Sequence, residues 1–279
     1  MLNSEQLNQF HKQGYAVLES VFTPDDVHAL RQAAQAIVAA FDIDRHRSVF
    51  STQDRDAGRD DYFFESAEAV HCFLEEGALN ADGQLTRPRE LAINKIGHAM
   101  HDLVPEFTQF CRLPQIAELL HKIGYRAPQL WQSMYIFKQP RIGGEVRWHQ
   151  DASYLFTEPS CVTGMWVALE DAHLGNGCLW VQPGGQRTPL RDRYEVDWTD
   201  RTGELRSIDT TPWPREGQGQ ALEVPMGSLI IFHDHLPHYS SQNFSNESRQ
   251  AFTMHFAEKG TQWSEKNWLQ RHNLPPFEL

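Results

Sequence analysis

The stretch VRWHQD, residues 146–151, places a histidine and an aspartate two residues apart in a strand-like run. In an extended strand, residues i and i+2 point to the same face, so His149 and Asp151 can reach one ion while Gln150 faces away. Two histidines and one carboxylate are the ligand set of a facial-triad non-haem iron site, which leaves coordination positions open for substrates and dioxygen. A His-x-Asp pair arises often by chance, so the third ligand decides whether this is a metal site.

A later apolar run, GSLIIF at residues 227–232, is long enough for a buried strand and leads into a histidine-rich loop. A ligand delivered by the end of such a strand can complete a site begun at residues 149–151. The residues themselves leave the choice of histidine open. The candidates for the third ligand are His233, His235, His238 and His255.

Arg249 opens the strand-like run at residues 250–256. An arginine at the start of an apolar strand needs a partner, because an unpaired buried charge is very costly. The carboxylate of a cosubstrate would supply that partner in bidentate geometry. A salt bridge to a neighbouring Glu or Asp would satisfy Arg249 equally well.

Composition bounds the classes of function. The chain has 279 residues, 40% of them hydrophobic, with 16 Phe and 8 Trp, which is enough for one sizeable core. The formal charge of −12 argues against non-specific binding of nucleic acid. No apolar run approaches the roughly 20 residues of a membrane span, so we expect no membrane partner.

The four cysteines form no CxxC pair, which argues against a thiolate zinc site. The first residues lack the basic and apolar regions of a signal peptide. We therefore expect a cytoplasmic protein whose four thiols are reduced. Nothing in the sequence fixes the oligomeric state.

Periodicity and capping signals predict helices in the first half of the chain and strands in the second. The expected helix at 4–12 has Ser4 as its cap, and the next runs from the Thr23-Pro24 start to about Phe41. Many short strands at regular intervals then suggest a sandwich or barrel under a helical N-terminal layer. Further helices are expected at 68–74, 98–111 and 114–123, and strands at 15–18, 93–96, 130–138, 145–150, 163–170, 178–182, 222–225, 228–232 and 250–257.

Two segments read as irregular. Residues 44–64 are polar and predict a surface loop near the mouth of the site. Residues 183–220 show little periodicity, and a long insertion of this kind is usually functional or mobile. Three arginines within it, Arg187, Arg191 and Arg193, would make a local basic patch if they all faced outward.

The whole pattern resembles the phytanoyl-CoA dioxygenase family of iron(II)- and 2-oxoglutarate-dependent oxygenases. The matching strings are long and run through nearly the whole chain, with residues 183–220 as the main departure. They lie at 93–99, 132–140, 143–146, 149–153, 170–172, 176–180, 249–253 and 267–270.

The resemblance implies a mainly β fold with flanking helices, built on a double-stranded β-helix, or jelly-roll, core. It implies one domain, 1–279, with the helical layer mainly in 1–125 and the jelly roll mainly in 126–260. The iron ligands would be His149, Asp151 and His238, because the family places its ligand histidine eleven residues before its arginine. Arg249 would then clamp the distal carboxylate of 2-oxoglutarate. The other residues implied in the 2-oxoglutarate pocket are Lys95, Met134, Trp166 and Ser240.

The implied activity is hydroxylation of a small organic substrate with iron(II), 2-oxoglutarate and dioxygen, releasing succinate and carbon dioxide. Desaturation, ring formation or halogenation on the same core are alternatives, and Asp151 argues against halogenation, because halogenating relatives lack the carboxylate ligand. A non-catalytic jelly-roll module that binds a metal or small molecule, and a hydrolytic zinc site, are rivals from other classes. We expect a substrate other than phytanoyl-CoA, chosen by residues 183–220 and 44–64.

Overall fold

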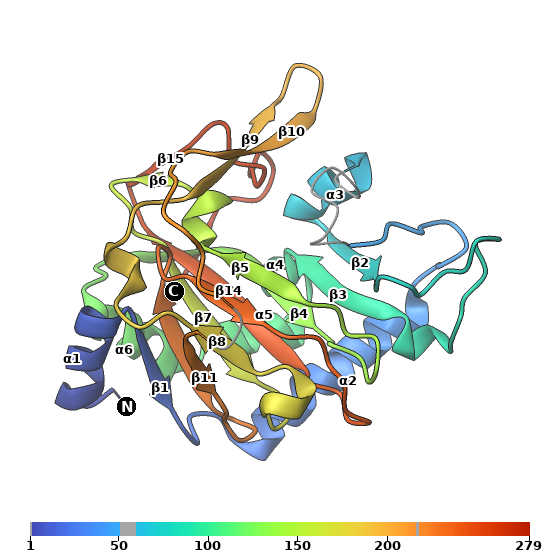
Figure 1. Ribbon diagram of the computed structural model, residues 1–279, viewed down its shortest axis with the longest axis horizontal. Helices are drawn as coiled ribbons and strands as arrows, with labels where there is room; N and C mark the ends of the chain where they lie inside the picture. Colours follow the sequence, from blue (N-terminus) through green and yellow to red (C-terminus); the bar gives the residue numbers. More distant parts are fainter. Residues whose placement is uncertain (1, 51–59, 216–217) are drawn as a thin grey trace.

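Two antiparallel sheets pack against each other in the computed structural model, which describes residues 2–50, 60–215 and 218–279 (Figure 1). A large and a small sheet packed in this way form a jelly roll, which confirms the expected fold class. The large sheet has the order β1 (Tyr15–Leu18), β12 (Leu229–His233), β7 (Thr163–Ala168), β14 (Ala251–Glu258), β4 (Pro128–Ile136), β3 (Ile93–His98) and β2 (Val70–Leu74), with β16 (Phe277–Glu278) also on β4. The small sheet has the order β11 (Gln220–Leu222), β8 (Leu179–Val181), β13 (His238–Ser240) and β5 (Val146–His149).

Helices cover the outer face of the large sheet, and Figure 1 shows α2 running behind it. Alternate residues of β14 explain this arrangement: Phe252 and Met254 pack with the helices, while Thr253 and His255 face the space between the sheets. The helices are α1 (Ser4–Gln13), α2 (Pro24–Ala40), α3 (Asp61–Glu65), α4 (Met100–Leu103), α5 (Pro105–Cys111) and α6 (Pro114–Ile123). Short 3-10 turns are η1 (Ser66–Glu68), η2 (Arg89–Leu91), η3 (Asp151–Ser153), η4 (Leu174–Asn176) and η5 (Gly185–Arg187).

Most of the expected elements form, and the departures have physical causes. Asn3, rather than Ser4, caps α1, since its side chain accepts the Gln6 amide. The helix expected at 98–111 is split, because Val104 precedes a proline and adopts extended angles. The helix expected at 68–74 is wrong. Its buried half instead pairs with β3 as strand β2, so sheet pairing overrides local propensity.

Residues 183–220 are more regular than their sequence suggests. They contain a two-stranded hairpin of β9 (Asp192–Asp197) and β10 (Thr202–Ser207), which projects from the rest of the molecule (Figure 1). The strand expected at 222–225 lies earlier, as β11. Helix α3 occupies part of the loop expected at 44–64, and residues 51–59 of that loop lie outside the described residues. Two short strands, β6 (Thr157–Glu158) and β15 (Gln262–Trp263), pair with each other in a separate sheet.

The four cysteines are free, in line with the expected reduced thiols. No helix within the described residues is both long enough and apolar enough to cross a bilayer.

Candidate metal centre

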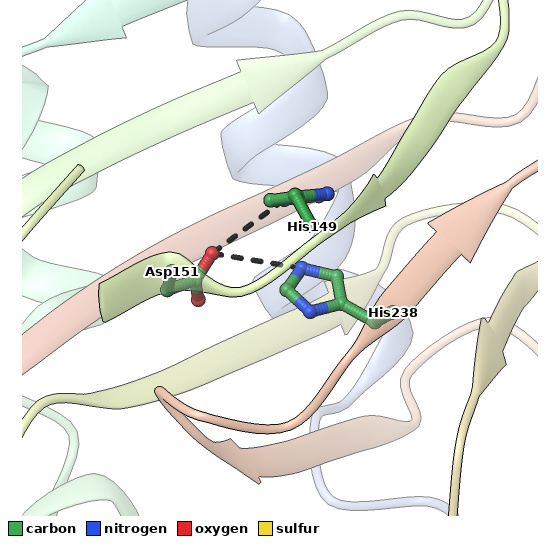
Figure 2. Close-up of side chains that lie close together, drawn as sticks. All are labelled: His149, Asp151 and His238. Atoms are coloured by element: carbon green, nitrogen blue, oxygen red, sulfur yellow. Dashed lines mark ion pairs between the residues drawn. The ribbon is translucent and has the colours of Figure 1, made fainter. Parts of the chain in front are cut away.

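Two neighbouring strands of the small sheet bring three side chains together (Figure 2). His149 ends β5, and His238 begins β13 directly opposite it. The chain stays extended through Gln150 and then enters η3 at Asp151, so His149 and Asp151 share one side as expected. Oδ1 of Asp151 lies 3.6 Å from Nε2 of His149 and 3.5 Å from Nε2 of His238. One ligand atom from each residue lies within 4.8 Å of the other two.

Both imidazole rings are held by backbone carbonyls. Nδ1 of His149 lies 2.9 Å from the carbonyl oxygen of Arg147, and Nδ1 of His238 lies 3.0 Å from that of Leu236. A carbonyl only accepts hydrogen bonds, so each Nδ1 carries the proton and each Nε2 presents a lone pair. Such a partner on the second nitrogen is the usual arrangement for a histidine that binds a metal.

The electrostatics keep these groups in the forms that bind metals. Burial lowers the pKa of His149 to about 4, and the nearby His238 adds to the effect. Burial by itself raises the pKa of Asp151, but His238 and His255 outweigh it and hold that pKa below its ordinary value. Imidazole nitrogens beside a carboxylate suit a divalent first-row metal such as iron(II). The residues present therefore fit the expected ion.

Gln150 points away from this cluster, as the strand geometry predicts. Its Nε2 donates to the carbonyl oxygens of Pro189, at 3.2 Å, and His235, at 2.9 Å, and its Oε1 accepts the backbone amide of Arg191 at 3.0 Å. A single buried side chain thus ties the metal-binding segment to the base of the β9–β10 hairpin.

The competing histidines fall outside the cluster of three. His233 ends β12 and His235 lies in the loop between β12 and β13, and neither lines the cavity described below. His255, the remaining candidate, lies in β14. Its Nε2 is 3.1 Å from Oδ2 of Asp151, whereas the other two rings face Oδ1.

The three side chains open into a cavity of about 250 Å³ between the two sheets. Every residue that the sequence assigned to the site lines this one cavity. They are Lys95, Met134, His149, Asp151, Trp166, His238, Ser240 and Arg249.

Arg249 is 1% exposed and lies in the cavity wall. Its Nε donates to the carbonyl oxygen of Gly177 at 3.1 Å, and its Nη2 donates to Oγ of Ser240 at 3.3 Å. Nη1 is buried and has no hydrogen-bond partner among the described residues. The ion pairs formed by arginines in the described part of the chain do not include Arg249. Burial lowers its pKa to about 10, so the side chain is still a cation at neutral pH.

The Gly177 carbonyl that accepts Nε of Arg249 lies where only glycine fits. Its φ is +84°, and a Cβ there would lie 2.6 Å from both Cδ of Lys138 and the carbonyl oxygen of Ser241. Only glycine fits this left-handed, crowded position, which aims its carbonyl at Arg249. The turn that ends at Gly177 thus helps to hold Arg249 in the cavity wall.

Two basic side chains of the cavity, Arg249 and Lys95, lie against aromatic rings. The Arg249 guanidinium carbon lies 5.3 Å from the Trp166 ring centroid. Nζ of Lys95 lies 3.4 Å from the centroid of Phe50 and 5.3 Å from that of Phe73. Both cations therefore sit against aromatic faces, which stabilises charge in a largely desolvated site.

Sequence reasoning considered His255 only as a rival third ligand, although the alternation of β14 places it on the same face as Thr253. No sequence signal pointed to Asp192 and Leu205, the contributions of the hairpin to the cavity.

Comparison with known proteins agrees with the geometry. The phytanoyl-CoA dioxygenase (PhyH) family model matches residues 10–251. Phytanoyl-CoA dioxygenase of Arabidopsis thaliana is 42% identical over 277 residues, covering 98% of this chain and 95% of the plant protein. Phytanoyl-CoA dioxygenase domain-containing protein 1 of Mus musculus is 40% identical, with 99% and 97% covered. The chain belongs to the phytanoyl-CoA dioxygenase family. It is accordingly a 2-oxoglutarate-dependent dioxygenase that uses iron(II), 2-oxoglutarate and dioxygen.

Solved structures share the fold at lower identity. EctD from S. alaskensis, solved with 2-oxoglutarate and 5-hydroxyectoine, superposes with a TM-score of 0.65 at 19% identity and covers 98% of this chain and 85% of its own. The α-ketoglutarate-dependent carbocyclase SnoK from nogalamycin biosynthesis gives 0.63 at 17% identity, with 95% and 87% covered. Both support the jelly roll of this phytanoyl-CoA dioxygenase family member.

Proposed function

We propose that this protein hydroxylates a small organic substrate at an iron(II) centre held by His149, Asp151 and His238. The observation that carries the proposal is the shared cavity, in which this cluster and the buried cation of Arg249 face the same space. A metal site alone would also suit a hydrolase. The additional buried cation suits a site that binds an anionic cosubstrate beside the metal.

Arg249 and Ser240 are the proposed seat for the distal carboxylate of 2-oxoglutarate. Gly177 and Ser240 hold one side of the guanidinium, which leaves Nη1 as a buried donor without a protein acceptor. A buried donor without an acceptor is costly, and a carboxylate would satisfy it. Met134, Trp166 and Lys95 line the rest of the proposed pocket.

The chain's residues bind and orient, while the bound iron supplies the activation of dioxygen that couples decarboxylation of 2-oxoglutarate to oxidation of a C–H bond. Asp151 contributes the anionic ligand, and the two Nδ1 contacts fix the ligand rings. Trp166, buried against the Arg249 side chain, helps to exclude water from that charge.

The substrate is proposed to bind where aromatic side chains and the hairpin border the cavity. Trp148 stacks on Tyr239 with ring centroids 5.4 Å apart, and both line the cavity with Leu205 of β10. This border suits an organic molecule with an apolar surface. The fold places chemistry on the sheets and selectivity on such peripheral segments.

Arg187, Arg191 and Arg193 do not form the shared basic patch considered from the sequence, because two of them are buried. Arg191 is 1% exposed and Arg193 is 7% exposed. Arg193 donates to Ser264 and Asn267, so it anchors the hairpin instead of facing solvent. This arrangement supports a substrate other than a highly anionic CoA thioester.

We also propose that residues 1–279 act as one domain. Strand β1 near the start and β16 at the end both pair within the large sheet, which supports this proposal.

Succinate release tests the proposed function. The purified protein should produce succinate from 2-oxoglutarate only with iron(II) and dioxygen, and a substrate should raise the rate together with a mass gain of one oxygen. Metal and 2-oxoglutarate binding without succinate under any condition would favour the non-catalytic module. Hydrolysis that depends on zinc and ignores 2-oxoglutarate would favour the hydrolase.

A further inference from the structure

His255 contacts one carboxylate oxygen of Asp151, and the two histidines of the candidate metal site face the other oxygen. Its Nε2 lies 3.1 Å from Oδ2, while Oδ1 faces the Nε2 atoms of His149 and His238. Both Asp151 and His255 are buried. The two oxygens of one carboxylate therefore have separate partners.

We infer that His255 is a positioning residue for the metal centre, and this inference rests on the proposed function. Its Nε2–H donates to Oδ2 and leaves Oδ1 as the oxygen directed toward Nε2 of His149 and of His238, where it would bind the metal. A carboxylate that used both oxygens would take a fourth coordination position. His255 thus helps to keep three positions open, the number that a facial-triad site needs for its cosubstrates.

The direction of the hydrogen bond follows from its acceptor. A carboxylate that binds a metal is deprotonated and its oxygens only accept hydrogen bonds, so Nε2 of His255, 3.1 Å from Oδ2, must carry the proton. Nδ1 of His255 is buried and has no hydrogen-bond partner among the described residues. The contact with Asp151 is therefore the polar interaction that fixes this ring.

The large sheet gives the contact its precision. His255 lies in β14, which is paired on both sides, with Gln132 of β4 opposite it on one side and Gly164 of β7 on the other. Asp151 belongs to η3, directly after a strand of the small sheet. The hydrogen bond therefore joins the two sheets across the cavity at the metal ligand itself.

Substitutions of His255 can distinguish a role in packing from a role as hydrogen-bond donor to Asp151. His255→Leu replaces the ring with an apolar side chain of similar size that has no N–H. His255→Gln keeps an N–H donor at a similar distance from the backbone. Loss of a hydrogen bond behind a metal ligand typically costs about 10- to 100-fold in metal affinity. We expect such a loss in His255→Leu and recovery of most of the affinity in His255→Gln.

The experiment is an anaerobic calorimetric titration with Mn(II) or iron(II), which measures binding without turnover. Wild type and Asp151→Ala are titrated first. A wild type that binds no metal, or an Asp151→Ala variant that binds as tightly as wild type, would count against the proposed function. If these two behave as proposed and His255→Leu still binds like wild type, the role of His255 alone is overturned.

A matched control separates positioning from stability. His101 is also fully buried, and it contacts Ser133 and Arg271 but does not line the cavity. His101→Leu should lower the thermal unfolding temperature and leave metal affinity unchanged. If His255→Leu does not fold, His255→Asn replaces it, because the shorter amide falls short of Oδ2. Affinity in His255→Asn equal to that in His255→Gln would contradict the inference.

Discussion

Nη2 of Arg249 lies 3.3 Å from Oγ of Ser240, and that hydroxyl donates to the same Gly177 carbonyl that accepts Nε of Arg249. The three groups fix one edge of the guanidinium within the protein. Nη1 has no partner in the described part of the chain, and Arg249 lines the cavity that also holds the candidate metal ligands. The arginine is thus oriented before any ligand arrives.

Replacing Arg249 tests this pre-oriented cation. Arg249→Leu should weaken 2-oxoglutarate binding by roughly 2–5 kcal/mol, because a buried carboxylate loses its charged partner. Anaerobic calorimetry with saturating Mn(II) measures the affinity. Metal affinity should stay near that of wild type.

Arg141→Leu is the control for Arg249→Leu, since Arg141 bonds to Asn246 and the carbonyl of Phe244 outside the cavity. Unchanged 2-oxoglutarate affinity in Arg249→Leu would mean that another cation holds the carboxylate. Lys95 would then be the first residue to substitute.

Asp151 is the single anionic side chain among the three proposed metal ligands. Asp151→Ala should abolish tight iron(II) binding and with it succinate production, as measured by titration and by succinate assay. His235→Ala is the control and should retain the metal, since His235 does not line the cavity. Full activity of Asp151→Ala would rule out the proposed ligand set.

The metal-free protein should lose stability as the pH falls, partly through His98. Burial holds the pKa of His98 well below its ordinary value of 6.5, so the folded ring stays neutral while the unfolded ring takes up a proton. Below about pH 6.5, one such ring lowers the free energy of unfolding by about 1.4 kcal/mol per pH unit. His98→Gln should reduce that slope in urea unfolding, whatever it does to the absolute stability.

The exposed His28 provides the comparison for His98. Its substitution by Gln should leave the pH slope as in wild type. Equal slopes for His98→Gln and wild type would show that His98 takes up its proton in the folded protein as well.

Phytanoyl-CoA is expected to give no more succinate than the reaction without substrate, because Arg191 and Arg193 are buried and cannot join Arg187 in a surface patch for the CoA phosphates. The measurement is succinate and hydroxylated product by mass spectrometry. Stoichiometric conversion of phytanoyl-CoA would return the protein to the activity for which its family is named.

The cluster of His149, Asp151 and His238 could be predicted from the sequence, because its motifs are either local or shared with a family. His149 and Asp151 follow from strand periodicity, whereas the choice of His238 required the family resemblance. The contact of His255 with Asp151 depends on how two sheets pack, and it could not be predicted from either strand alone. The stretch 68–74 was wrongly predicted as helical because a short apolar run suits either a helix or a buried strand.

The hairpin escaped prediction for a different reason. Strand β10 is largely exposed and polar, with Leu205 as its one large apolar residue, so it carries no alternation to detect. Its regularity comes from cross-strand pairing with β9, where Tyr194 and Val196 are buried.

The hydrogen bonds of the Gln150 side chain have a consequence for engineering. Because this side chain joins the segment between His149 and Asp151 to the backbone of Pro189 and Arg191, the base of the hairpin and the metal ligands share one rigid anchor. Residues 198–201, at the far end of the hairpin, lie beyond that anchor. We therefore expect that loops of other lengths and compositions can be grafted at this turn while His149 and Asp151 keep their positions.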